Sequence, residues 1–240
     1  MNRRRAAGLG FLAAAPLGSC VIVEFLIGGD PMLVVEAVTS SLVSVWIALV
    51  AIDLFAARQH ERALSANARE VALFGVPCSI APALGHDALV IGAIRPRILL
   101  GAPLVSALSD AELQAVVYHE DHHRRTRAPL RAAALGGWLR LFGRAGRVRG
   151  AVLDRMADLE SLADADAIRR GSSPRSLARA LLKGDLSRQP VAFAYAADRR
   201  VRRLLDGADG VHAEVTTPLP YEWLPIALLA AVALACHIGL

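Results

Sequence analysis

The stretch HEDHH, residues 119–123, places two histidines four positions apart. On an α-helix such residues differ by about 40° in direction and about 6 Å in height, so His119 and His123 would project from one face and could bind one metal ion. Glu120 would point to the side of that face, from which a carboxylate can take a proton from a metal-bound water. The alternative is a charged helix surface that is rich in histidine by chance. His122, about 100° from His123 around the helix, suits such a solvated or interfacial position.

A catalytic zinc ion usually has three protein ligands and one open position, so HEDHH requires a further ligand. The stretch DLESLADADAI offers Glu160 and Asp164, which are four positions apart and share a helix face. One of them could bind the metal while the other hydrogen-bonds the second nitrogen of a ligand histidine and so fixes its tautomer. Asp158 and Asp166 point in other directions. The spacing therefore predicts a site built from two helices.

The helix that carries HEDHH has clear start and stop signals. Ser109 and Glu112 form a capping box, and Asp110 adds an acid in the first turn, where the helix dipole favours negative charge. Apolar residues follow at helical spacing, and Pro129 indicates the end, so a helix is expected at 110–127. Further helices are expected at 151–170, 174–184 and 196–205.

Short apolar groups upstream of this helix predict a small sheet. ALVIGAI and RILLG lie on either side of Arg95-Pro96 and have the composition of two strands. Pro96 beside the second strand favours an edge position for it. Residues 58–72, with Ala and Leu at helical spacing, are expected to extend a membrane helix into solvent.

The composition indicates a membrane protein. Hydrophobic residues make up 55% of the 240, and the mean hydropathy is +0.42. Apolar stretches near or above the roughly 20 residues that cross a bilayer occur at 6–27, 32–57 and 221–240. The first is too long for a typical signal peptide core and is followed directly by the second, as in a helical hairpin. Acids in these stretches, such as Asp53, should face neighbouring helices or lie near segment ends.

The arginines predict the orientation. MNRRR and ARQHER flank the first two apolar stretches, and GGDP between them carries no basic residue, so residues 58–220 should be cytoplasmic. The net charge of +5 favours anionic headgroups or an acidic partner, whereas no nucleic-acid-binding motif accompanies it. The arginine-broken segment 130–150 is expected at the membrane interface. Three cysteines, two of them in apolar stretches, predict neither disulfides nor a cysteine zinc site.

HEDHH followed by ESLADADA resembles the gluzincin membrane peptidases, whose second motif is E-x-x-A-D-x-x-A; Glu160, Ala163, Asp164 and Ala167 match its fixed positions. The preceding IGAIRPRILLGAPLVSALSDAELQAVVYHE is similar to the segment before the zinc helix in BlaR/MecR-type peptidases and the related HtpX-like group. The similarity covers about 90–170 and is weak over 171–220. It departs at Arg127-Ala128-Pro129 and in the shortened segment 130–143, and it does not imply β-lactam binding.

The resemblance implies a role for each matched residue. His119, His123 and Glu160 would be ligands of one zinc ion, Glu120 the general base and Asp164 the partner of a ligand histidine. Arg200 would contact the substrate or transition state. A peptide substrate would add to the sheet at an edge strand formed by residues 97–101.

The sequence thus predicts an α+β, mainly helical membrane protein with about three transmembrane helices and a zincin-like cytoplasmic domain with a small sheet. Its parts would be a transmembrane hairpin at 1–57, a zinc metallopeptidase domain at 58–220 and a transmembrane helix at 221–240. The expected activity is zinc-dependent cleavage of a protein, such as a transcriptional repressor. The alternatives are quality control of membrane proteins and a non-catalytic sensor or scaffold that retains the zinc fold.

Overall fold

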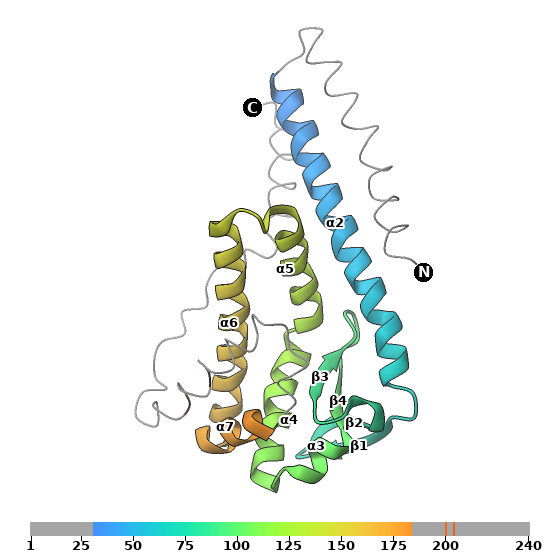
Figure 1. Cartoon of the computed structure of the whole chain (residues 1–240), viewed down its shortest axis with the longest axis vertical. Helices are drawn as coiled ribbons and strands as arrows, with labels where there is room; N and C mark the ends of the chain where they lie inside the picture. The colour runs from blue at the N-terminus through green and yellow to red at the C-terminus, as the bar shows by residue number, and fades with distance from the viewer. Residues whose placement is uncertain (1–30, 184–199, 201–203, 205–240) are drawn as a thin grey trace. The chain divides into compact units, whose positions relative to one another are not determined.

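The computed structural model describes residues 31–183, Arg200 and Leu204, with side chains from residue 38 onward. The described part is mostly helical with one four-stranded mixed sheet (Figure 1). Its elements, in chain order, are α2 (Pro31–Leu64), β1 (Arg69–Leu73), β2 (Val76–Ala81), the 3₁₀ turn η1 (Pro82–Leu84), β3 (Ala88–Ile91), β4 (Arg97–Gly101), α3 (Ala102–Ala107), α4 (Asp110–Arg125), α5 (Ala128–Phe142), α6 (Gly146–Arg169) and α7 (Pro174–Lys183).

The described residues belong to two compact units. One comprises 56–132 and 149–183 with Arg200 and Leu204, and it contains the sheet and HEDHH. The other comprises 31–55 and 133–148, which are most of α2 and α5.

Strand β1 corrects the expectation of a helix over 58–72. Helix α2 ends at Leu64, and Asn67 takes a left-handed conformation with φ 64° before the strand begins at Arg69. Strands β1 and β2 then pair antiparallel from Leu73–Val76 outward, around a two-residue turn in which Phe74 and Gly75 both have positive φ. The apolar spacing of residues 69–72 fits a strand as well as the predicted helix. Only pairing with the hairpin partner decides between the two.

Strand β4 is central, so the predicted edge position of 97–101 is wrong. The strand order is β1-β2-β4-β3, with β4 parallel to β2 and antiparallel to β3. Pro96 precedes the first residue of the strand, where its missing N–H costs no ladder hydrogen bond. The edge strand on this side is β3.

The run RILLG supplies the core on both faces of the sheet. Ile98 and Leu100 pack in one buried cluster with Val117 of α4, whereas Leu99 packs with Leu84 in a second cluster on the opposite face. A continuous apolar run is typical of a strand covered on both sides. The sheet therefore packs against the inward face of α4 and fixes its position.

The predicted helices around the site are confirmed within a few residues. Helix α4 carries the complete capping box of Ser109 and Glu112 and ends at Arg125. Helix α6 begins at Gly146, five residues before the predicted start, and α7 covers 174–183. Arg200 and Leu204 are both helical, within the predicted helix at 196–205, whose other residues lie outside the described part.

Helix α2 contains a segment, Val38–Leu64, that by length and composition could cross a membrane, with a hydropathy of 2.0. It is the only such segment among the described residues. Large apolar side chains on it are exposed, as on a helix that faces lipid: Val38, Leu42, Ile47 and Phe55. The predicted membrane segments at 6–27 and 221–240 lie outside the described residues.

Helix α5 packs against α2 within their unit. The Trp46 indole N–H donates to the Ala134 carbonyl over 3.2 Å. Gly137 leaves room for this ring, since a Cβ there would lie 2.9 Å from its nitrogen. Asp53 forms an ion pair with Arg140, as expected of an acid that faces a neighbouring helix.

We expect Lys183→Met to lower the free energy of unfolding by about 1 kcal/mol near neutral pH, because the half-exposed ammonium donates to buried Glu112 over 2.7 Å. Hydrogen bonds from Lys183 and Ser109 lower the pKa of Glu112. A lowered folded-state pKa stabilises above the unfolded pKa, and this contribution disappears as the pH falls through the folded value. Denaturant titrations in detergent should therefore converge with wild type in acid. Arg179→Met on the same helix is the control, and a pH-independent difference would contradict the assignment.

Candidate metal centre

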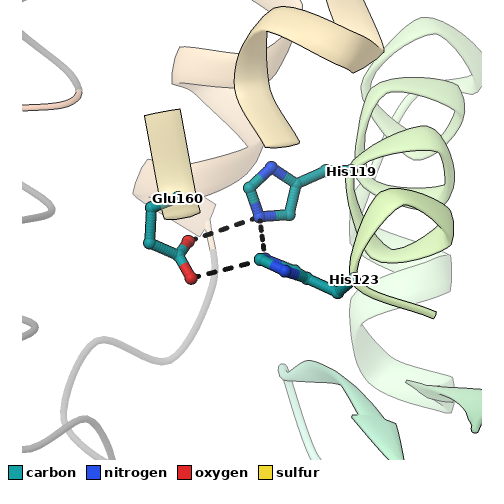
Figure 2. A group of neighbouring side chains, drawn as sticks. All are labelled: His119, His123 and Glu160. Atoms are coloured by element: carbon teal, nitrogen blue, oxygen red, sulfur yellow. Dashed lines mark hydrogen bonds and ion pairs between the residues drawn. The ribbon is translucent and has the colours of Figure 1, made fainter. Parts of the chain in front are cut away.

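His119 and His123 of α4 and Glu160 of α6 converge on one point (Figure 2). The two histidine Nε2 atoms lie 3.0 Å apart. The Glu160 carboxylate places Oε2 3.4 Å from Nε2 of His119 and Oε1 3.3 Å from Nε2 of His123. The helices thus bring together three ligand atoms from positions about 40 residues apart in the sequence.

The residues fit a zinc ion. With metal–ligand bonds of about 2.0–2.1 Å, neighbouring ligand atoms of a tetrahedron lie about 3.3–3.4 Å apart, close to the separations observed here. Two imidazoles and a carboxylate are also a donor set that leaves zinc an open fourth position. These residues could therefore hold one zinc ion.

Alanines bring the ligand face of α6 into the interior. Ala163 and Ala167 are completely buried, and Asp164 between them is nearly so. Small side chains at these positions let neighbouring elements approach the helix closely. This spacing explains physically why E-x-x-A-D-x-x-A alternates acids with alanine.

Asp164 lies behind His119 rather than beside the ligand atoms. Its Oδ1 is 2.9 Å from Nδ1 of His119, within hydrogen-bonding distance, although the ring nitrogen is not aligned for a linear hydrogen bond. An acceptor on Nδ1 favours the tautomer whose Nε2 lone pair is free for a metal. The spacing left open which acid takes each position, and the resemblance implied Glu160 as the ligand. In the structure Glu160 lies at the ligand atoms and Asp164 behind the ring.

Arg200 connects both acids of α6. Its Nε and Nη2 donate to the two oxygens of Asp164 over 2.9 and 2.6 Å, and Nη1 donates to Glu160 over 2.7 Å. A guanidinium forms such two-pronged contacts with carboxylates because its donors lie in one plane. The predicted substrate or transition-state contact is not tested by this arrangement, in which the three donors serve Glu160 and Asp164.

The Glu120 carboxylate is positioned beside the ligand histidines without a committed partner. Within the described part of the chain it forms no hydrogen bond or ion pair, yet the charges of His119, His123 and Glu160 act on it. Asp87, which precedes β3, also contributes to its environment. Sequence reasoning missed Asp87, because its proximity to Glu120 depends on the folding of the sheet.

The electrostatics separate the two glutamates. Burial raises the pKa of Glu120, because the charged form is disfavoured away from water. Burial acts in the same direction on Glu160, but the Arg200 guanidinium and the two histidines hold its pKa well below the usual range. For His119, burial lowers the pKa, but contacts with Asp164 and Glu160 outweigh it and raise the value to about 10. Glu160 is thus suited to bind a cation, and Glu120 to exchange a proton.

A second set of ion pairs joins α4 and α6 near the site. Buried Asp121 contacts Arg124 over 2.6 Å, Arg125 over 3.2 Å and Arg170 over 2.7 Å. Arg125 also pairs with Asp166. The i, i+3 and i, i+4 spacing of Arg124 and Arg125 from Asp121 was the signal in the sequence for this network.

His122 belongs to this second set and not to the ligand atoms. Its Nδ1 lies 3.6 Å from Asp166, and burial lowers its pKa. His122 therefore provides a matched control for the ligand histidines on the same helix.

We expect His119→Ala to abolish binding of one divalent metal ion per chain, because it removes a ligand nitrogen and the partner of Asp164. His122→Ala should retain the metal. Elemental analysis of both purified variants after equilibration with zinc would measure the stoichiometry. Equal zinc content in wild type and His119→Ala would show that the centre is assigned incorrectly.

Comparison with known proteins adds no relative. A scan against protein-family models, a search of curated proteins and a search of solved structures found no match to this chain.

Proposed function

We propose that this protein is a membrane-anchored, zinc-dependent endopeptidase of the gluzincin type. The observation that supports this proposal is the convergence of His119, His123 and Glu160 at separations that suit zinc. Glu120 lies beside them, and its carboxylate pairs with no described residue. The fixed positions of the HExxH and E-x-x-A-D-x-x-A patterns supply these residues. One zinc ion per chain is the proposed cofactor.

A bound zinc ion would lower the pKa of a water molecule and polarise the scissile carbonyl. Glu120 acts as the general base, because its carboxylate follows the ligand His119 directly and forms no hydrogen bond or ion pair with the residues that the structure describes. Its burial raises its pKa toward the working range of a group that accepts a proton and returns it to the leaving amine. Asp164 orients His119, and Arg200 holds both acids of α6 in place.

Strand β3 is the proposed position for an extended peptide substrate. It pairs with β4 on one side and ends the order β1-β2-β4-β3, so its other edge has no strand partner among the described residues. Strand β3 packs against α4, the helix that carries Glu120, which supports this position. A peptide that adds to the sheet here would be held by main-chain hydrogen bonds.

The proposed substrate is a protein that is available to a membrane-anchored enzyme with a cytoplasmic catalytic domain. The BlaR/MecR resemblance favours a transcriptional repressor, and the HtpX resemblance favours a damaged membrane protein. The multi-pass anchoring and the orientation rest on the apolar stretches and arginines of the sequence, together with the one candidate span in α2.

We expect Glu120→Gln to reduce proteolysis by about 10²- to 10⁴-fold while leaving zinc content unchanged, because it removes the base without removing a ligand. Cleavage of casein and self-cleavage by the purified full chain would measure the rate, with Glu70→Gln on β1 as a control for loss of a carboxylate. Zinc binding with no Glu120-dependent cleavage would instead support a non-catalytic sensor or scaffold.

We expect Arg200→Lys to raise the zinc dissociation constant by about tenfold, because an ammonium cannot contact both oxygens of Asp164 as the guanidinium does. Excess zinc should then restore most of the lost turnover. Competition with a fluorescent chelator would measure affinity, with Arg179→Lys as the control. Lost turnover with unchanged zinc affinity would favour the substrate or transition-state contact.

A further inference from the structure

The β3–β4 hairpin ends in an exposed tip, residues 92–96, with an unusual composition. Ile94 is 83% exposed, the highest value among the exposed large apolar side chains of the described residues. Arg95 and Arg97 beside it are exposed as well. Ile94 is thus a lone apolar side chain flanked by arginines. Among the described residues it belongs neither to the candidate metal centre nor to a buried apolar cluster.

The tip is held in one conformation. Ile91 and Arg97 close the hairpin as a register pair. Gly92 has φ +88°, and a Cβ at this position would lie 2.6 Å from the Arg95 carbonyl oxygen, so the turn is too tight for another residue.

A hydrogen bond fixes the tip to the end of the candidate membrane helix. The Gly92 N–H donates to Oε1 of Glu61 over 2.8 Å. Glu61 lies four residues beyond Ala57, where the apolar stretch of α2 ends, which is about 6 Å along the helix. If the apolar stretch occupies the hydrocarbon layer, Glu61 and the tip lie at the level of the headgroups.

We propose that the hairpin tip inserts Ile94 into the anionic headgroup layer of the membrane that α2 crosses. Four exposed arginines match a negatively charged surface: Arg95 on the tip, Arg97 at the start of β4, and Arg58 and Arg62 on α2. The proposal rests on the proposed membrane crossing of α2.

This contact selects a class of substrate. Strand β3 leads directly into the tip, so a tip at the bilayer surface holds the free edge of the sheet close to the membrane. Extended segments that emerge from the bilayer or lie on its surface reach this edge first. Membrane proteins and lipid-bound proteins are then favoured over freely diffusing ones.

The test uses the full chain in vesicles, with the three native cysteines replaced and one environment-sensitive fluorophore attached at Ile94→Cys. In vesicles that contain anionic lipid, we expect its emission to shift to the blue and to be quenched by lipids that carry a quencher near the headgroup. The matched control is Phe74→Cys, an exposed apolar tip residue of the β1–β2 hairpin, which should remain unquenched. Replacing Arg95 and Arg97 by glutamate should reverse the shift at Ile94, since each arginine contributes about fivefold to surface binding.

A probe at Ile47→Cys, exposed in the middle of α2, tests the membrane crossing of α2 separately from the membrane contact of the tip. If deep quenchers reach Ile47 but headgroup quenchers do not reach Ile94, the tip proposal fails and the membrane crossing stands. If Ile47 is not quenched, the crossing itself fails. Shielding of Ile94 in native membranes but not in pure lipid would show that the tip binds a protein, which also overturns the proposal.

Discussion

The enclosure of two carboxylates on α6, Asp164 buried and Glu160 partly buried, is the constraint on which the rest of the site depends. Removing an ionised carboxylate from water costs several kcal/mol unless it is paired and hydrogen-bonded. Glu160 and Asp164 meet this requirement through His119 of α4 and through Arg200. The elements that carry these partners are therefore held at α6 by charge, and loss of one partner would leave another charge buried and uncompensated.

The sheet provides the rigid support that this arrangement needs. Central strand β4 is buried on both faces, and one of its clusters includes Val117, two residues before His119. The inward face of α4 is therefore fixed by apolar packing, and its polar face by ion pairs with α6. Apolar packing and ion pairs thus act on two different faces of one helix, and together they fix the positions of His119 and His123.

Charge compensation also governs the unit built from α2 and α5. An acid and an arginine on largely apolar helices are costly in lipid when each is alone, and Asp53 pairs with Arg140. The close fit of Gly137 to Trp46 brings the helices near enough for this pair to form.

Local signals in the sequence determined the helices that carry the site. The capping box at Ser109, the apolar spacing that follows it and the positions of His119, His123 and Glu160 act within a few residues, so they could be predicted without knowledge of the fold.

Tertiary structure decided the features that depend on partners distant in the sequence. Residues 69–72 are a strand because β2 pairs with them, and β4 is central because β2 and β3 bind its two edges. Glu160 and Asp164 had equal standing in the sequence, and the approach of α4 separated their positions. The contacts of Arg200 with Glu160 and Asp164 also depend on tertiary structure. Hydrogen bonds between strands and ion pairs between helices produce no periodic pattern of residues in the sequence. They can therefore be identified only in the folded protein.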